Sequence, residues 1–376
     1  MSGWHYEAER LDGAGGATLL ASDLPLDDVS LTQTLSGADS MTASITPEVA
    51  RLLGPDGEPL LAGDWSTAIY AISDDGEVMS GTVLETPSFN GPSYSLEGTG
   101  FCGYPYGQPC VTSQFWVGID AIDAAREVWE HLQSQPGGNL GVNVDSTTMS
   151  GKKIGTKLTQ GQFDTINGPL TFESGPFRLA WYQTNDLGDQ IDQLSKNTPF
   201  DWVERHQFEG DEIKHYLDFG SPKLGRRLEN LRFVVGENVA LPQVTDHGGD
   251  FATEILVLGA GEGAAMIRGS YSGPRRGVRR VKVVQDQTLR TATAANARAK
   301  LEWQRAQNIR DITSITLFDH PHAPLGSVAV GDELYLEGRV DWIEIGMWVR
   351  VTSRTIRPAD LSSVTLTVSR TDRMAG

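Results

Sequence analysis

Short runs of alternating apolar and polar residues, separated by tight-turn residues, dominate the first hundred positions of the chain. The segment DVSLTQTLSGADSMTASITPE holds two such runs, Val29–Leu35 and Met41–Ile45, on either side of Ser36–Asp39. WSTAIYAISDDGEVMSGTVLET repeats the pattern around the turn Asp74–Gly76, and SYSLEGTGF supplies a further strand. Side chains alternate between the two faces of a strand, and Asp-Gly favours the positive φ angles of hairpin turns. Strands of this kind, joined by tight turns, predict a small barrel or sandwich.

The middle of the chain changes to helical periodicity. Ile119–Gln133 carries apolar side chains at helical spacing. TNDLGDQIDQLSKNT predicts a second, shorter helix, with Thr184 or Asn185 as its cap. PFDWVERHQFEGDEIKHYLDFG then predicts a hairpin of Phe200–Phe208 and Glu212–Phe219. We expect this region to form a mixed α+β domain.

The last third returns to strands, interrupted by one helix at about Thr288–Gln307. The expected strands are Leu231–Val235, Thr253–Leu258, Ala265–Tyr271, Arg279–Val284, Asp311–Leu317, Glu333–Leu336, Trp342–Val351 and Ser363–Val368. With 376 residues the chain is too long for one small core. The predicted fold class is mainly β with an α+β insertion: two barrel-like domains of similar size, which indicates duplication, plus the mixed domain. We expect the first β domain at 1–105, the α+β domain at 106–226, the second β domain at 227–287 and 309–376, and an inserted helix at 288–308.

Charge argues against a protein that reads nucleic-acid sequence. The net charge is −18, whereas contacts to phosphates need a basic face. The one dense basic run is better explained as a solvated loop and strand end; it comprises Arg275, Arg276, Arg279, Arg280 and Lys282. No stretch approaches the roughly 20 apolar residues that span a bilayer, and MSGWHYEAERLDG does not have the pattern of a signal peptide. The protein is therefore expected in the cytoplasm where it is made, unless a larger assembly carries it out.

The two cysteines, Cys102 and Cys110, lie in FCGYPYGQPC. The Gly and Pro residues between them could let the two side chains meet, but two cysteines are too few for a disulfide framework in a chain of this length. Free thiols are expected in a reducing cytoplasm. The two cysteines form no CxxC motif and have no histidine nearby in the sequence, so zinc binding at these thiols is not predicted.

Two patterns suggest enzymes, and each has a structural explanation that we prefer. Gly259, Gly261 and Gly263 follow a predicted strand, but a strand rather than a helix comes next, so a hairpin turn is expected instead of a dinucleotide site. Asp186, Asp189 and Asp192 form one acidic stripe on the second predicted helix, which a solvated face explains. No GxSxG motif occurs. No catalytic residue and no cofactor is therefore predicted.

His320 and His322 are separated only by Pro321, in the segment DHPHAPLGSVAVGDELYLEG that begins at Asp319. In an extended segment the two rings would point to opposite sides, and Pro321 favours an extended conformation at His320. We therefore expect a stiff connector between strands rather than a metal site.

The other histidines give no stronger indication of a metal ion. His206 and His215 are expected to face each other across the predicted hairpin, but two imidazoles without a third ligand make a weak site. His5, His131 and His247 are scattered, without the spacing of ligands. No metal is predicted.

Three stretches, taken in order, resemble a known family. They are VSLTQTLSGADSMTASI, LGDQIDQLSKNTPFDWVERHQF, and DHPHAPLGSVAVGDELYLEG with WVRVTSRTIRPADLSSVTLTVSR. Together with the β, α+β, β layout, this order resembles the tail hub proteins of long-tailed bacteriophages. These are the minor tail or baseplate hub proteins, especially of siphophages that infect actinobacteria.

The resemblance implies a homotrimer in which each subunit contributes two barrel-like domains to a pseudo-sixfold ring. Such a ring adapts the sixfold tail tube to a threefold tip, and DNA passes through it without specific binding. The implied neighbours are a distal tail protein or tube ring above, tip or fibre proteins below, and a tape measure protein in the lumen, with no stable membrane anchor. The implied location is the virion tail tip, after assembly in the host cytoplasm. Some larger hubs carry a domain that cuts peptidoglycan, but this chain ends directly after its last predicted strand, so no enzyme activity is expected.

Two other functions stay open. A carbohydrate- or receptor-binding tail component would expose aromatic side chains, for which Phe101–Trp116 is the best candidate, although we prefer to explain this segment as a buried loop between domains. A cell-wall hydrolase would use the helix that carries Asp186, or Glu204. A zymogram on cell walls and a sugar-binding array separate these two functions from a structural hub.

Overall fold

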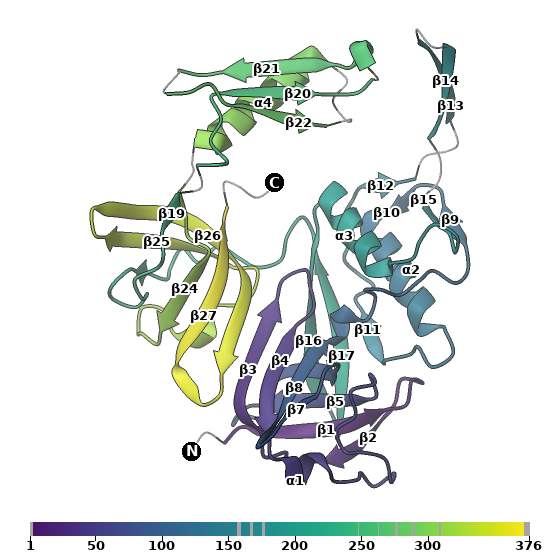
Figure 1. Cartoon of the computed structure of the whole chain (residues 1–376), viewed down its shortest axis with the longest axis vertical. Helices are drawn as coiled ribbons and strands as arrows, with labels where there is room; N and C mark the ends of the chain where they lie inside the picture. The colour runs from purple at the N-terminus through teal and green to yellow at the C-terminus, as the bar shows by residue number, and fades with distance from the viewer. Residues whose placement is uncertain are drawn as a thin grey trace.

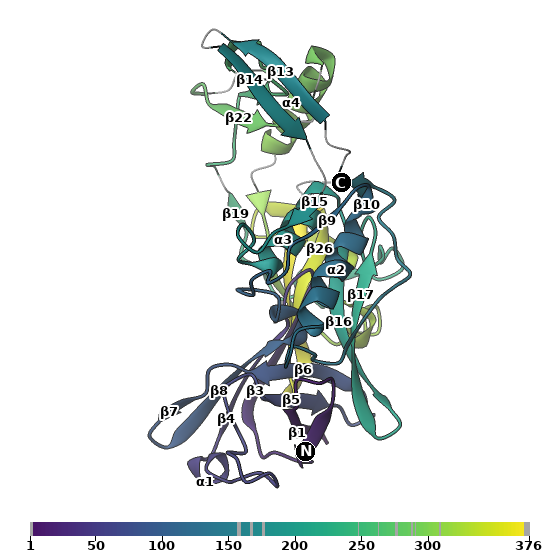
Figure 2. The ribbon, with the colours of Figure 1, turned by 90° about the vertical axis from the view of Figure 1, so that its right-hand side faces the viewer.

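The computed structural model of the chain (Figures 1 and 2) describes residues 3–155, 159–165, 168–174, 177–246, 248–261, 263–274, 277–286, 289, 291–307 and 310–371. Strands hold far more of these residues than helices do, which confirms the mainly β fold class. Within the described residues, no helix has the length and apolar character needed to cross a membrane.

The first β unit forms one half of a large sheet. Its elements are β1 (His5–Leu11), β2 (Ala17–Ala21), β3 (Asp27–Thr34), β4 (Ser40–Ile45), α1 (Pro47–Ala50), β5 (Thr67–Ile72), β6 (Val78–Leu84), β7 (Ser88–Asn90) and β8 (Ser93–Gly100). Both predicted hairpins are present, as β3–β4 and β5–β6. Every residue of β5 is buried. Its alternate side chains belong to two different cores, which is why the sequence of this strand is almost entirely apolar.

The mixed domain follows a short 3-10 turn at Phe101–Gly103. Its elements are β9 (Gln114–Trp116), β10 (Ile119–Asp120), α2 (Ala121–Gln133), β11 (Val142–Val144), β12 (Lys153–Ile154), β13 (Thr159–Thr165), β14 (Gly168–Ser174), β15 (Phe177–Leu179), α3 (Leu187–Asn197), β16 (Asp201–Glu209) and β17 (Glu212–Gly220). Both predicted helices and the predicted hairpin β16–β17 are present. The cap of α3 is Asp186 and not the expected Thr184 or Asn185, because its carboxylate accepts a hydrogen bond from a helix N–H group, as that of Asp120 does at the start of α2.

The second β unit forms the other half of the large sheet. Its elements are β18 (Phe233–Val234), β19 (Thr245–Asp246), β23 (Arg310–Asp311), β24 (Ser314–Phe318), a 3-10 turn (Leu325–Ser327), β25 (Glu333–Val340), β26 (Ile343–Arg357) and β27 (Asp360–Arg370). The last two strands are longer than predicted, because β26 pairs with β25 over residues 343–350 and with β3 over residues 353–356, while β27 pairs with it over residues 349–357.

The pairing of β3 with β26 makes one sheet out of the two β units. Residues 31–34 pair antiparallel with residues 353–356, and the hydroxyl groups of Thr32 and Thr355 lie 2.9 Å apart. The main path of the sheet runs β18-β25-β26-β3-β4-β8-β6-β5-β1-β2. Because β18 and β2 end this path in the described residues, the sheet is open, and the expected closed barrels are not confirmed. Duplication of the two units stays a prediction.

The insertion in the second β unit is larger than the single helix expected at 288–308. β20 (Glu254–Leu258), β21 (Arg268–Ser272) and β22 (Val281–Gln285) form a separate sheet, and α4 (Ala292–Gln307) packs on it. These strands were expected in the second β domain, because their alternation would look the same in either sheet. The short pair β19–β23 connects this unit to the rest of the chain. In both views the unit of β20–β22 and α4 lies at the opposite end of the molecule from β1 (Figures 1 and 2).

Candidate functional site

The loop that carries His320 and His322 is a tight turn, not an extended connector. The N–H of Ala323 donates to the carbonyl of His320 at 2.9 Å, which closes a turn over Pro321 and His322. The two rings therefore lie side by side, with their centroids 4.9 Å apart. The expectation that they point to opposite sides is wrong, because Pro321 occupies a turn position that suits its fixed φ.

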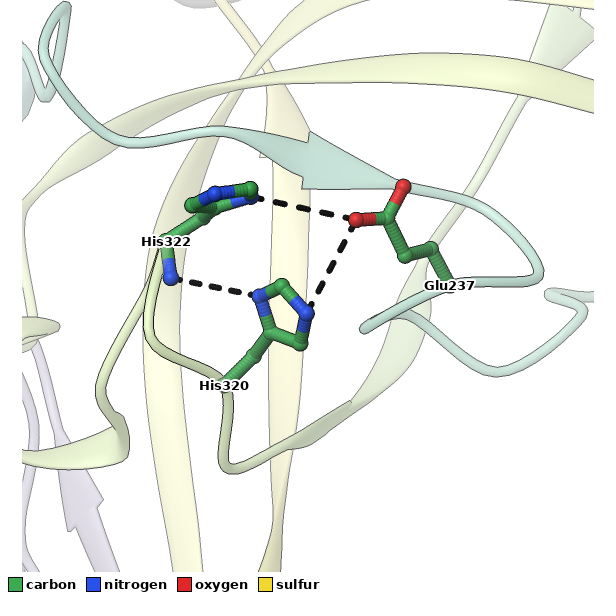
Figure 3. A group of neighbouring side chains, drawn as sticks. All are labelled: Glu237, His320 and His322. Carbon is green, nitrogen blue, oxygen red and sulfur yellow. Dashed lines mark hydrogen bonds and ion pairs between the residues drawn. The ribbon is translucent and has the colours of Figure 1, made fainter.

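Both rings point toward Glu237, which lies in a different loop (Figure 3). Glu237 Oε1 is 3.7 Å from Nε2 of His320 and 3.8 Å from Nδ1 of His322. The three ligand atoms all lie within 4.8 Å of one another, and no other group of three such side chains that could hold a metal ion was found in the described part of the chain. The sequence alone does not predict this position of Glu237, since no local pattern connects it with residues more than eighty positions away.

Backbone hydrogen bonds hold the two loops together. The N–H of Phe318 donates to the carbonyl of Asn238 at 2.9 Å, and that of Arg232 donates to the carbonyl of His322 at 3.3 Å. The buried Asn238 fixes its own loop, since its amide accepts from Val234 N–H and donates to the Arg232 carbonyl, each at 2.8 Å. The backbone positions of the three side chains are thus set by the fold.

A second cluster of titratable groups lies where the hairpin β16–β17 packs against the first β unit. Glu204 Oε1 accepts from Asp39 N–H at 3.1 Å, and Oε2 accepts from Cys102 N–H at 2.8 Å. Burial raises the pKa of Glu204 to about 7. Burial and the neighbouring Glu204 carboxylate raise the pKa of Asp39 well above its ordinary value. The pair borders a cavity of about 590 Å³, but both carboxylates are used to hold backbone amides.

His206 and His215 face each other across the hairpin, as predicted. They form a cross-strand pair, and their Nδ1 atoms lie 3.0 Å apart. The His215 ring stacks on Phe101 with a centroid distance of 4.1 Å. Burial lowers the pKa of His215 to about 4, and it lowers the pKa of His206 well below its ordinary value. This buried pair packs as part of the core between the two units.

The remaining candidates have structural roles where they are described. Asp186 caps α3, and Asp192 accepts a hydrogen bond from the Tyr106 hydroxyl at 3.0 Å. The glycines at 259, 261 and 263 lie between β20 and β21, which pair antiparallel as the expected hairpin. Cys102 and Cys110 are free thiols, and burial raises the pKa of each.

The basic run and the scattered histidines add no further site. Arg279 forms an ion pair with Glu254 at 2.9 Å and is largely exposed, which agrees with a solvated strand end. His131 is buried and accepts from the Val111 amide at 3.1 Å, and His5 is 3.8 Å from Glu7. Arg275, Arg276 and His247 lie outside the described residues.

The aromatic stretch at 101–116 divides into a buried and an exposed part. Phe101 is buried, while Phe115 is 71% exposed. Trp181 and Tyr182 are also exposed, and the Trp181 amide donates to Ser113 Oγ at 3.3 Å, so they lie near Phe115. The preferred explanation, a buried loop between domains, therefore fits the first half of the segment and not the second.

No family model and no curated protein sequence matches this chain. Several solved structures match it in fold. The 43 kDa tail protein of prophage MuSo2 from Shewanella oneidensis matches with a TM-score of 0.56 and 11% identity, over 99% of this chain and 100% of that one. A tail protein from Neisseria meningitidis matches with a TM-score of 0.53 and 13% identity, over 98% and 97% of the two chains. The prophage tail protein gp18 from Listeria monocytogenes matches with a TM-score of 0.54 and 11% identity, over 98% and 95%.

The chain has the fold of phage tail proteins. Because each match covers 98% or more of the chain, this tail-protein fold includes both β units and the mixed domain. At 11–13% identity the likeness concerns the fold alone. What individual side chains such as Glu237, His320 and His322 can bind is therefore inferred from the geometry of this chain and not from these neighbours.

Proposed function

We propose that this protein is a structural component of a phage tail, and more specifically a trimeric hub at the tail tip. The tail-protein fold over almost the whole chain carries this proposal. Three copies of a chain with two β units would place six similar units around one axis. Such a ring adapts a sixfold tube to a threefold tip. The protein acts by assembly and not by catalysis.

Contacts between subunits would use the edges of the sheet. Strand β2 ends the main path of the sheet, so among the described strands only β1 pairs with it and its other edge faces away from the sheet. An open edge is a template for pairing with another chain. Neighbouring subunits in a ring satisfy such edges by pairing them. A distal tail protein or tube ring above, and tip or fibre proteins below, would cover the two faces of the ring.

The acidic composition supports a channel through which DNA slides. With a net charge of −18, each trimer carries a large excess of carboxylates. An acidic wall repels phosphates and prevents the duplex from adhering during passage. The lumen, which also accommodates a tape measure protein before ejection, is therefore acidic in this proposal. The assembly forms in the host cytoplasm and ends at the tip of the virion tail.

The mass of the purified protein tests the hub. We expect native mass spectrometry to give three times the 40.8 kDa of the chain. Electron cryomicroscopy of the same sample should show a ring with threefold symmetry and six similar lobes. A protein that stays monomeric at high concentration, both alone and with its tail neighbours, contradicts the hub. A neutral or basic channel wall contradicts only the proposed role of the acidic residues.

A second candidate function, binding of a host carbohydrate, is favoured by the exposed aromatic patch of Phe115, Trp181 and Tyr182. Flat aromatic faces at a surface bind sugars and other amphipathic ligands. If the patch binds sugar, Trp181→Ala should abolish signals on an array of cell-wall glycans. Trp342→Ala is the matched control, since Trp342 is 80% exposed on the β25–β26 turn, elsewhere in the fold. No glycan signal from the wild-type trimer excludes this function.

A further inference from the structure

We propose that Glu237, His320 and His322 bind a transition-metal ion of the Zn²⁺ class. The three residues are far apart in sequence but converge on one point at the surface of the second β unit (Figure 3). This proposal is independent of the hub function, because it rests only on the ligand geometry of one chain.

The distances suit a shared ion better than direct hydrogen bonds. The two separations between Glu237 Oε1 and an imidazole nitrogen are 3.7 and 3.8 Å, beyond the usual range of a hydrogen bond. Ligand atoms about 2.0–2.1 Å from a tetrahedral ion lie roughly 3.3 Å from each other. The observed separations, all within 4.8 Å, are somewhat wider than this. Small rotations of three side chains that are open to solvent would close the difference.

The loops that carry the ligands are already fixed. The His320–Ala323 turn and the loop around Asn238 are joined by the backbone hydrogen bonds of Phe318 and Arg232. An ion would therefore need to order only side chains, and not the backbone. Nearby, Arg232 is paired with Glu337 at 2.7 Å, which directs its charge toward that carboxylate.

The donor set selects among cations. Two imidazoles and one carboxylate suit Zn²⁺, Ni²⁺, Cu²⁺ or Fe²⁺, whereas Mg²⁺ and Ca²⁺ require mainly oxygen ligands. Three protein ligands leave one position of a tetrahedral ion for water. The surface position gives the ion a direct path from solvent.

One hydrogen bond must be exchanged when the ion binds. The amide of His322 donates to Nδ1 of His320 at 3.2 Å, so in the absence of metal the proton of a neutral His320 ring lies on Nε2. Coordination through Nε2 requires that proton to move to Nδ1, which then cannot accept from the amide. Because the amide lies in an exposed turn, water can take its place. The exchange weakens binding but does not prevent it.

Titration of tag-free protein with ZnCl₂ in a calorimeter tests the site. We expect one ion per chain and a rise in melting temperature with added Zn²⁺. His320→Ala and His322→Ala should each weaken binding by more than the roughly 10–100-fold expected for loss of an outer-shell partner. Glu237→Gln should weaken it by about tenfold or more, since it removes a charged ligand. Any heat measured with MgCl₂ or CaCl₂ should be the same for wild type and for these three variants, because neither ion should bind at this site.

His5→Ala is the matched control. His5 is also partly exposed and lies 3.8 Å from a carboxylate, that of Glu7, but it has no second imidazole beside it. Its removal should leave Zn²⁺ affinity unchanged. Circular dichroism in EDTA should show that all variants fold. The proposal is overturned if wild-type protein takes up no Zn²⁺, or if the double variant H320A/H322A binds Zn²⁺ as tightly as wild type.

Discussion

Replacing Arg350 by alanine is expected to lower the free energy of unfolding by about 3–5 kcal/mol, the usual effect of removing one partner of a buried ion pair. Arg350 lies on β26 and is only 5% exposed. It forms an ion pair with Asp201 of β16, and it also donates to the carbonyls of Gly331 at 3.0 Å and Leu224 at 2.8 Å. Alanine would leave a largely buried carboxylate and two carbonyl groups without this partner.

The size of this effect follows from the place of Arg350 in the fold. Asp201 belongs to the mixed domain, Arg350 to the second β unit, and Leu224 to the segment that connects them. Asp201 also accepts from the Leu224 amide at 2.8 Å. One guanidinium group therefore joins two parts of the chain that have separate cores and the segment that connects them.

Urea denaturation followed by circular dichroism and by tryptophan fluorescence measures this loss. The two signals must coincide for a single free energy to apply. Arg279→Ala is the control, because Arg279 also pairs with a carboxylate but its side chain is 58% exposed, and we expect it to cost less than about 1 kcal/mol. Similar losses for the two variants would contradict the structural role assigned to Arg350.

Elements defined by local periodicity could be predicted from the sequence. The hairpin of β16 and β17 and the helix α2 begin and end within two residues of their expected positions. Their signals are local: alternation, helical spacing and turn residues within about 20 positions. The pairing of His206 with His215 followed from the same local register.

Long-range pairing could not be predicted in this way. β3 and β26 join residues more than three hundred positions apart, and their alternating pattern would suit any neighbouring strand. For the same reason the strands β20–β22 looked like part of the second β unit until their partners were known. Alternation tells which face of a strand is buried, but it does not tell which strand lies beside it.

The candidate metal site was missed for two reasons. The spacing of His320 and His322 was interpreted for an extended segment, although proline is equally typical of a turn. Glu237 contributes from another loop, and only the tertiary fold brings it near. A proline between two histidines should therefore be considered in both conformations before a shared ligand role is excluded.

Replacing Glu204 by glutamine is expected to change how the stability of the protein depends on pH. Burial raises the pKa of Glu204 to about 7 in the fold, from an ordinary value of 4.5. The unfolded chain then loses its proton at lower pH than the folded chain does. The wild-type protein therefore has its full stability from this group below about pH 4.5 and loses it as the pH rises to about 7. Glutamine does not titrate, so the variant avoids this loss.

The histidine pair acts in the opposite direction. Burial lowers the pKa of His215 from 6.5 to about 4, so the unfolded chain takes up this proton first as the pH falls. The stability that a neutral His215 contributes is complete above about pH 6.5 and is lost as the pH falls toward 4. His206 acts with the same sign. In wild type the effects of Glu204 and of the histidines oppose each other between about pH 4.5 and 6.5. In Glu204→Gln the contribution of Glu204 is absent, while the histidines and the buried Asp39 still titrate.

Urea denaturation at pH 5 and pH 8 separates these contributions. The difference in unfolding free energy between Glu204→Gln and wild type should shift in favour of the variant by about 2–3 kcal/mol from pH 5 to pH 8. The absolute difference at either pH also contains the loss of one acceptor, since Glu204 holds the amides of both Asp39 and Cys102. For that reason the change with pH, and not the stability at one pH, is the decisive quantity.

Glu97→Gln is the control, since Glu97 lies on the exposed side of β8. The difference in unfolding free energy between this variant and wild type should change little between the two pH values. A difference between Glu204→Gln and wild type that stays constant with pH would mean that Glu204 is ionised in the fold at pH 5 and that water reaches its carboxylate.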